Sequence, residues 1–377
     1  MTSEERKAAR YARRVQKREE KKAAGYAQYD NFDAVFSYDN LYRSYKLCRR
    51  GVAWKCSTQK YMTQAPLNVF TTYRLLRDGK FKTKGFVEFD IFERGKIRHI
   101  RSVAMEERVV QRCLCDHSLV PMLGRTFIYD NGASLKGKGY SFSVDRMCHH
   151  LRRHYKKYGN EGYVLLFDFS KFFDNVSHRI TTMALEKNFT DERLLRLANH
   201  FIDAFGDIGL GLGSQISQTM ALASANRLDH FVKEVLRIKG YGRYMDDGYL
   251  LHPSKEYLKT CLEAIKAICE ELEIKLNVKK TQIVKISHGF SFLKVRFFLT
   301  KTGKVIRRMH RAGIVRMRKK LKAFQRMVAE EKMQVEDVHA SFQSWQAYTM
   351  NFNGYKTLQS ANALYDKLFI HDWLCRA

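Results

Sequence analysis

Three acidic residues stand out in a strongly basic chain. Asp246 and Asp247 are adjacent within the apolar and aromatic stretch GYGRYMDDGYLL, although the 377-residue chain has a formal net charge of +29. Asp168 ends the apolar segment YVLLFD, far upstream. Two neighbouring carboxylates repel each other unless a cation offsets the repulsion. If the segments that carry these acids pair in one sheet, the three carboxylates converge and provide the oxygen ligands that Mg²⁺ prefers at two-metal phosphoryl-transfer sites.

A solvated turn is the common alternative for two adjacent acids. Tyr244, Met245, Tyr249 and Leu250 flank the pair, and side chains of this kind favour burial. The turn is therefore expected to belong to a packed sheet, which favours the metal-site interpretation.

The segments that carry the acids have the patterns of strands. An apolar strand ends at Asp168, and Tyr241–Met245 pairs with Gly248–Leu251 as a hairpin. Alternation on either side of a glycine turn predicts another hairpin over Phe86–Val103. The segment LNVKKTQIVKIS reads as a strand or a turn, and FSFLKVRFFLTKTGKVIRR reads as one further hairpin.

Helical periodicity covers much of the remaining chain. It runs from Asn31 to Lys80 and again from Met309 onward, where the chain is also very basic. Residues 1–24 have good helix propensity but no clear apolar stripe, so they form either a solvated or RNA-contacting helix or a frayed basic tail. Strands and helices in this mixture predict an α/β fold.

The composition points to a polyanionic partner. Hydrophobic residues make up 45% of the chain, enough to bury a sizeable core. The chain has 68 Lys and Arg against 39 Asp and Glu, so binding to phosphates would be driven by counterion release. Nucleic acid is the leading candidate.

Nothing in the sequence predicts a membrane segment or an oxidising compartment. The apolar runs are far shorter than a bilayer span, and the N-terminal segment lacks the apolar core of a secretory signal. The eight cysteines are scattered without zinc-ligand spacing, which favours reduced structural thiols. We expect a cytoplasmic protein with no membrane partner.

A series of motifs resembles that of the reverse transcriptases, the RNA-directed DNA polymerases, in unbroken family order over residues 80 to 345. The motifs are KIRHI (96–100), FDFSKFFD (Phe167–Asp174), LGSQISQ (Leu212–Gln218), YMDD (Tyr244–Asp247), LNVKKTQI (276–283) and FSFLKVRFF (290–298). The nearest likeness is to prokaryotic enzymes, especially those of diversity-generating retroelements and of antiviral defence.

This resemblance implies an α/β right-hand polymerase fold with an antiparallel palm sheet, fingers and an α-helical thumb. The expected organisation is a helical basic N-terminal extension over residues 1–80, fingers over 81–160, palm over 161–290, and primer grip with a helical basic thumb over 291–377.

The resemblance also assigns catalytic roles. Asp168 and Asp246, with the carbonyl of Phe169, would hold two Mg²⁺ ions, with Mn²⁺ as an alternative, and Asp247 would support the site. Phe173 would be the aromatic gate that excludes a ribose 2′-OH. Further residues expected around the dNTP are Lys96, Arg98, Leu212, Gly213, Ser217, Gln218 and Lys280.

Basic residues are expected along the bound nucleic acid, with a merely solvated surface as the alternative. They are Lys136 and Lys138 of the fingers loop, and Arg307, Arg308, Arg316, Lys319 and Lys320 towards the thumb. Two departures from the family pattern are the loop ASLKGKG, which lacks the usual Arg, and FLKV in place of Phe-Leu-Gly. Leu212-Gly213 with Ser217-Gln218 is the variant associated with retroelement enzymes that copy imprecisely.

The expected reaction is templated addition of dNTPs to a primer 3′-OH by an enzyme of a prokaryotic retroelement. Its partners would be an RNA template, specifically a dedicated noncoding RNA, a DNA primer and product, and an accessory protein or a second copy of the chain. One alternative is a defence enzyme that copies a dedicated noncoding RNA or synthesises DNA without a template. Another is a catalytically inactive RNA-binding scaffold, which the three intact acids argue against.

Overall fold

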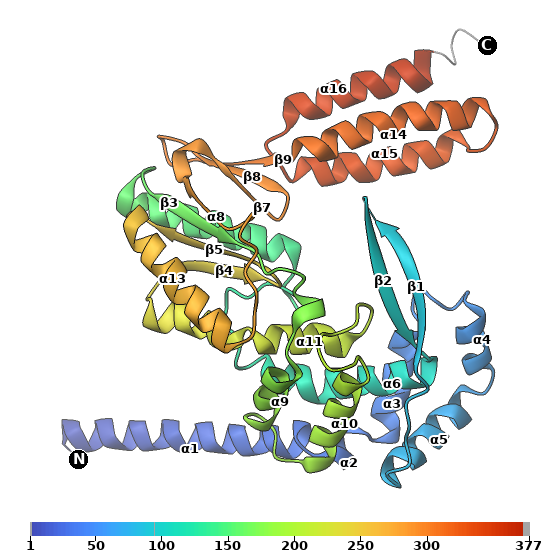
Figure 1. Cartoon of the computed structure of the whole chain (residues 1–377), viewed down its shortest axis with the longest axis vertical. Coiled ribbons are helices and arrows are strands. Elements are labelled where there is room, and N and C mark those ends of the chain that lie inside the picture. Colours follow the sequence, from blue (N-terminus) through green and yellow to red (C-terminus); the bar gives the residue numbers. More distant parts are fainter. Residues whose placement is uncertain (1, 94, 372–377) are drawn as a thin grey trace. The chain divides into compact units, whose positions relative to one another are not determined.

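In the computed structural model, which describes residues 2–93 and 95–371, the chain forms two compact units (Figure 1). The first comprises the residues up to Gly139, Asp168–Arg237 and Glu263–Asn277. The second comprises Tyr140–Phe167, Ile238–Leu262 and the chain from Val278 onward. Because each unit is built from several segments, neither could be recognised from chain order alone.

The first unit is mainly helical. Its helices are α1 (Ser3–Tyr29), α2 (Phe32–Val35), α3 (Tyr38–Cys48), α4 (Cys56–Thr63), α5 (Ala65–Arg77), α6 (Met105–Leu114), α7 (Val120–Leu123), α9 (His178–Glu186), α10 (Glu192–Asp203), α11 (Gln215–Ser224) and α12 (Asn226–His230). Residues 3–24, expected to form either a helix or a frayed tail, are helical, and a capping box between Thr2 and Glu5 closes the first turn of α1.

The end of α1 is fixed by a pair of carboxylates. Asp30 is 8% exposed and accepts hydrogen bonds from the backbone and hydroxyl of Thr190, at 2.8 and 2.7 Å, and from the backbone of Asp191. Asp191 in turn accepts from the backbone of Phe32 at 2.7 Å and also caps α10. These bonds hold α1 and α2 against the start of α10.

The predicted hairpin over Phe86–Val103 is confirmed. Strands β1 (Phe86–Glu93) and β2 (Lys96–Val103) pair antiparallel with Phe86 opposite Val103. Alternation puts Arg98 and Ile100 on one face of β2 and His99 and Arg101 on the other.

The second unit contains a four-stranded antiparallel sheet. Its order is β4 (Gly240–Tyr244), β5 (Asp247–His252), β3 (Tyr163–Phe167) and β6 (Gln282–Lys285). Helix α8 (Tyr140–Tyr158) packs against this sheet (Figure 1). Val144, Met147 and Leu151 of α8 share a buried cluster with residues of β3 and β5, which explains why these strands are almost continuously apolar.

A second sheet follows in the chain. It consists of β7 (Phe290–Phe292), β8 (Val295–Leu299) and β9 (Val305–Met309). The sequence predicted one hairpin here, and β8 and β9 form it; the prediction was incomplete because a tight turn at Leu293 and Lys294 adds a third strand, β7. Both residues have positive φ, 48° and 61°, which glycine normally supplies, so the turn carried no sequence signal.

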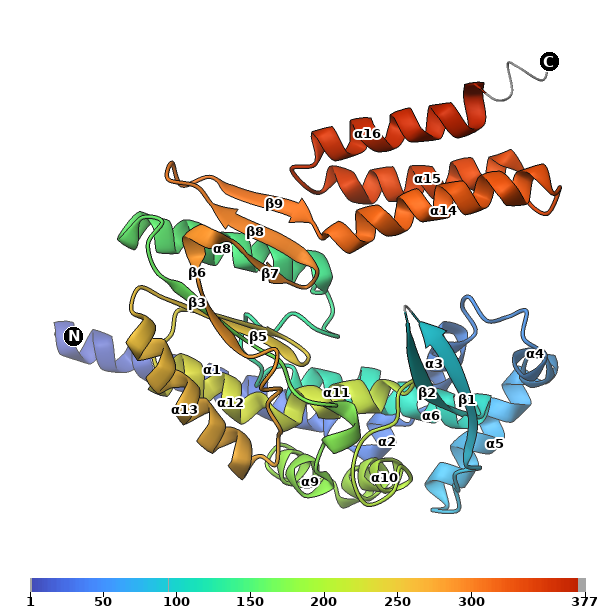
Figure 2. The ribbon, with the colours of Figure 1, turned by 45° about the horizontal axis from the view of Figure 1, so that its top comes forward.

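The chain ends in three helices that lie side by side (Figure 2). They are α14 (Arg311–Ala329), α15 (Val335–Met350) and α16 (Tyr355–Asp366). Leu321, Val338 and Phe342 are buried in their common core, where the rings of Phe342 and Tyr365 stack at 4.7 Å. One more long helix, α13 (Lys255–Glu271), lies earlier in the chain, between β5 and β6.

None of the helices in the described part of the chain combines the length and apolar character that crossing a bilayer requires. The α/β class is confirmed, with antiparallel sheets and a helical C-terminal region as expected.

Candidate active site

The three acids identified in the sequence converge at one end of the four-stranded sheet. One carboxylate oxygen from each of Asp168, Asp246 and Asp247 lies within 4.8 Å of the others. Asp168 directly follows β3, whose last residue, Phe167, pairs with Gly248 of β5. Asp168 is 4% exposed, and the other two acids are half-buried.

The β4–β5 turn holds two of the acids. Tyr244 pairs with Asp247, so the turn residues are Met245 and Asp246, and Asp247 begins β5. The predicted strand boundaries at Met245 and Gly248 were therefore off by one residue on each side. Met245 has a φ of +53°, a conformation that costs a non-glycine residue about 1–2 kcal/mol.

Arg243 holds this turn through a hydrogen bond, a role that the sequence patterns did not predict. It is fully buried in β4 and donates a hydrogen bond from Nη1 to the carbonyl of Met245 at 2.7 Å. A buried guanidinium is stable only when its donors are satisfied. The signal was present, because Arg243 is the one basic residue within GYGRYMDDGYLL.

Asp168 is oriented by Asn277, which the sequence also did not single out. The backbone of Asn277 donates to the carbonyl of Asp168 at 2.7 Å, and its amide Nδ2 donates to the Oδ2 carboxylate oxygen at 3.3 Å. The backbone of Ser170 donates to the carbonyl of Lys275 at 2.7 Å. Phe169 and Leu276, which lie between these two hydrogen-bonded pairs, therefore face each other in an antiparallel β-bridge. The segment LNV thus braces the chain that follows β3.

Gly248 is required by close packing. A Cβ at this position would overlap the ring of Phe167 on the neighbouring strand. The glycine leaves room for the buried Phe167 ring to lie over it on one face of the sheet, so that β3 and β5 pair up to the ends that carry the acids.

Residues expected around the nucleotide come together in part. The backbone of Leu210 donates to the carbonyl of Phe173 at 2.7 Å, in the short 3₁₀ turn η2 (Phe173–Asn175). Leu212 forms a parallel bridge with Ile100 of β2. A Cβ at Gly213 would lie 3.3 Å from Ile100 Cγ2. The loop before α11 therefore lies between η2 and the hairpin.

Other expected nucleotide-binding residues are placed differently. Ser217 is fully buried in α11, and among the described residues its hydroxyl has no hydrogen-bond partner. Gln218 is exposed and accepts a hydrogen bond from Ser134 Oγ at 2.9 Å. Lys280 is exposed just before β6, and Arg98 is exposed on β2. Lys96 begins β2, but its side chain lies outside the described atoms.

Residues 84–297, more than half of the chain, match the family model for reverse transcriptase (RNA-dependent DNA polymerase). The chain belongs to this family. The matched domain is that of an RNA-dependent DNA polymerase, a nucleotidyltransferase, and the reverse transcriptase-like fold expected from the motifs is confirmed.

This reverse transcriptase is similar to several known proteins. It is 24% identical to protein YkfC of Escherichia coli (strain K12) over 272 residues, 59% of this chain and 67% of YkfC. A telomerase from Candida albicans, solved with a TWJ fragment of telomeric RNA, is 11% identical with a TM-score of 0.46, over 82% of this chain and 65% of the telomerase. Apo telomerase from Candida tropicalis is 12% identical with a TM-score of 0.44, over 65% of this chain and 53% of the telomerase. The chain spans less than two thirds of these telomerase chains.

The basic residues expected along nucleic acid fall into two groups in the reverse transcriptase. Lys138 donates to the carbonyls of Tyr129 and Asn131 at 2.7 and 3.0 Å. Arg307 pairs with Asp145 at 3.2 Å, and Lys320 donates to Ser341 at 2.9 Å. These three hold local structure. Lys320 is nevertheless exposed, as are the remaining members of the set, Lys136, Arg308, Arg316 and Lys319.

Proposed function

We propose that this reverse transcriptase serves a prokaryotic retroelement and adds dNTPs to a primer 3′-OH under the direction of a dedicated noncoding RNA. The observation that carries the catalytic part is the convergence of Asp168, Asp246 and Asp247 within 4.8 Å. Hard oxygen donors from three carboxylates fit Mg²⁺, with Mn²⁺ as an alternative.

In this proposal Asp168 and Asp246, with the carbonyl of Phe169, hold the two ions, and Asp247 supports them. When bound, the ions supply Lewis-acid stabilisation of the attacking and leaving oxygens. Asn277 orients the Asp168 carboxylate through its 3.3 Å hydrogen bond, and Arg243 fixes the turn that carries Asp246. Both contacts preorganise the carboxylates before substrate arrives.

The nucleotide site proposed around this centre uses the motif residues. Phe173 excludes the ribose 2′-OH, while Lys96, Arg98 and Lys280 hold the triphosphate. Leu212 and Gly213 lie beneath the nascent pair, with Ser217 and Gln218 following on α11. The hydrogen bond from Leu210 to the carbonyl of Phe173 supports this arrangement, because it fixes the gate relative to the loop.

The retroelement role is supported by Leu212-Gly213 and Ser217-Gln218, the sequence variant associated with imprecise copying, and by similarity to a bacterial protein. The proposed domain layout is an N-terminal extension (1–80), fingers (81–160), palm (161–290) and primer grip with thumb (291–377). A further proposed partner is an accessory protein or a second copy of the chain. Sequencing the nucleic acids that copurify with the protein, together with its products, tests the role. Products without template sequence would favour the defence alternative.

The catalytic assignment is tested by Asp246→Asn, with the exposed Asp207→Asn as a matched control. The expected loss of primer extension on poly(A)·oligo(dT) with Mg²⁺ is about 100-fold or more, because a metal ligand is worth several kcal/mol to the transition state. Circular dichroism and duplex affinity should stay near wild type, since the substitution conserves shape. A rate for Asp246→Asn that equals that of Asp207→Asn would remove Asp246 from the metal site.

A further inference from the structure

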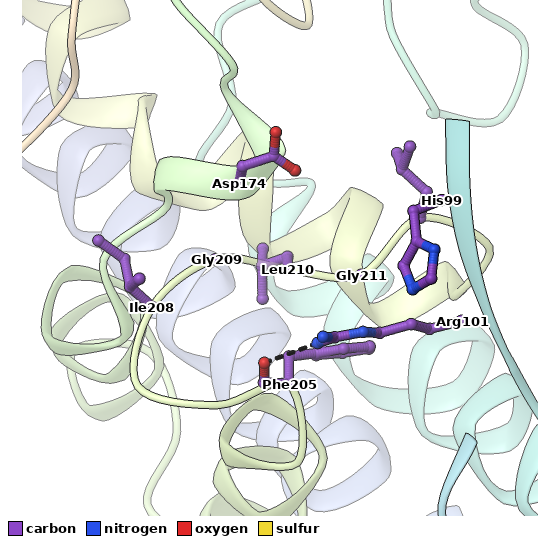
Figure 3. A pocket seen from close by; sticks show the side chains of 9 residues that line it. His99, Arg101, Asp174, Phe205, Ile208, Gly209, Leu210 and Gly211 are labelled. Atoms are coloured by element: carbon purple, nitrogen blue, oxygen red, sulfur yellow. Dashed lines mark hydrogen bonds between the residues drawn. The ribbon is translucent and has the colours of Figure 1, made fainter. Parts of the chain in front are cut away.

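A cavity of about 240 Å³ lies behind the hairpin, within the first unit (Figure 3). Its walls come from β2, from η2 and from the loop between α10 and α11. The lining residues are His99, Arg101, Asp174, Phe205, Ile208, Gly209, Leu210, Gly211 and Leu212. His99 and Arg101 occupy the face of β2 opposite Arg98, so the cavity lies on the other side of β2 from this proposed triphosphate-binding residue.

One wall of the cavity is a flat, fixed cation. Figure 3 shows the Arg101 side chain lying along the ring of Phe205. Its Nη1 donates to the Phe205 carbonyl at 2.8 Å, and its Nε lies 3.0 Å from the Glu88 carboxylate. Phe205 stacks on Phe86 at 5.0 Å, with 19° between the ring planes. Arg101 therefore presents a planar surface of the kind on which aromatic rings stack.

The opposite wall offers an acceptor. Asp174 is exposed at the cavity, and within the described part of the chain no donor reaches its carboxylate. Its backbone is held by the loop: Gly209 has a φ of +87°, and a Cβ there would lie 2.6 Å from the Asp174 carbonyl oxygen. Gly209 also donates to the carbonyl of Val176 at 2.9 Å. The backbone of Asp174 is thus fixed at the cavity, and its exposed carboxylate is available on the wall opposite Arg101.

The charges of the cavity disfavour a phosphate. The cation of Arg101 is already paired with Glu88, and His99 lies 2.8 Å from Asp90 and 3.3 Å from Glu88. Asp174 adds a further negative charge. A phosphate would gain no net attraction, whereas a flat, neutral ring with amino donors would stack on Arg101 and donate to Asp174.

We propose that this cavity takes one unpaired template base, the base immediately 5′ of the templating base, and prefers guanine over uracil. This inference rests on the proposed function, which places Leu212 and Gly213 beneath the templating pair. Leu212 lines the cavity, and its carbonyl accepts from the backbone of Arg101 at 3.3 Å, so the cavity adjoins that position. Guanine presents two adjacent N–H donors that one carboxylate can accept together. Uracil presents one N–H between two carbonyls that the carboxylate repels.

The test uses primer–template duplexes with a short 5′ RNA overhang, identical except for G or U at that position. Fluorescence anisotropy without dNTP measures their affinities. Wild type should bind the G duplex about tenfold tighter, the value of one charged hydrogen bond. Asp174→Asn should bring the ratio to about one, because the amide no longer accepts both donors. Asp207→Asn, on the same loop outside the cavity, should keep the wild-type ratio.

Two further measurements keep the result decisive. Affinity of Asp174→Asn for the U duplex reports whether the variant folds, and Arg101→Lys keeps the charge but removes the stacking surface, so it should weaken binding of the G duplex. Photo-crosslinking of 6-thioguanosine at the test position should label residues 205–212 or β2. Equal G and U affinities in wild type, or crosslinks confined to other segments, overturn the cavity assignment. Primer extension on both duplexes separates this outcome from failure of the proposed function, in which neither would be extended.

Discussion

Leu212 is the residue at which the chemistry of this reverse transcriptase departs most clearly from its family pattern. The family pattern that the sequence motifs resemble has a glutamine at this position, whose amide can hydrogen-bond near the incoming nucleotide, whereas leucine offers only apolar contact. The position of the backbone does not depend on that side chain, because the Leu212 carbonyl accepts from Arg101 and its strand segment bridges Ile100. A substitution can therefore probe the side chain alone.

We predict that Leu212→Gln lowers misincorporation on a defined RNA template. One restored hydrogen bond contributes about 1 kcal/mol, which corresponds to several-fold better discrimination. Deep sequencing of wild-type and variant products measures the error spectra, and Asp207→Asn, an exposed change on the same loop and outside the cavity, serves as the control. If wild type and Leu212→Gln have the same error spectrum, Leu212 does not cause imprecise copying, and the defence alternative is favoured.

At the scale of the elements, the end of α15 is fastened to the second sheet. Asn353, just beyond α15, accepts from the Arg307 backbone through Oδ1 at 2.9 Å, and its own backbone donates to the Arg307 carbonyl at 2.8 Å. The hydroxyls of Tyr348 and Tyr140 lie 3.1 Å apart, and Phe352 packs on the core between α8 and the sheets. Arg307 thus joins β9 to the helices as well as pairing with Asp145.

We predict that Asn353→Ala shortens the products made in one binding event. Loss of the side-chain acceptor removes one exposed hydrogen bond, about 1 kcal/mol, so the helices of the proposed thumb should detach from β9, and the enzyme release its duplex, several-fold more often. Processivity with a trap for released enzyme should fall, while the single-turnover rate of the first addition should not. Asn351→Ala is the control, because Asn351 donates only to carbonyls of its own helix. Equal processivity in the two variants would contradict the anchoring role.

The elements also show what sequence patterns can predict. The β1–β2 hairpin agrees with its predicted limits because alternation and Gly95 define both strands and the turn. The acids were predicted to converge because each lies at or directly beside the end of a strand. The turn at Leu293 and Lys294 was missed because neither residue type favours positive φ.

Contacts between distant segments account for the rest of the site. Asn277 reaches Asp168 across more than a hundred residues, and Asp174 faces Arg101 only because the α10–α11 loop packs on η2. No local periodicity encodes such pairs. Arg243 is different: a charge within an apolar strand was a visible signal, and only its target, the Met245 carbonyl, required the structure.

At the scale of the whole molecule, the net charge of +29 overstates the charge available to nucleic acid. Many basic side chains are committed to local pairs, such as Lys259 with Glu256 and Lys266 with Glu263 on α13, and Lys332 with Glu330. Exposed pairs of this kind contribute little to stability, but they cancel charge at the surface. The exposed Arg316 and Lys319 of α14 are better placed to meet phosphates.

We therefore predict that replacing Arg316, Lys319 and Lys320 with glutamine makes the affinity for an RNA–DNA duplex less dependent on salt. Each lost phosphate contact should lower the slope of log K against log salt by about 0.7 to 0.9. Because Lys320 donates to Ser341, the expected change corresponds to two contacts and not three. The matched control replaces Lys259, Lys266 and Lys332, which changes the net charge equally but removes lysines already paired with glutamates. If both triple variants change the slope alike, binding responds to overall charge and α14 has no special part in it. If only the α14 variant does, phosphates lie along that helix, because long-range attraction alone would not distinguish two surfaces of equal charge at physiological ionic strength.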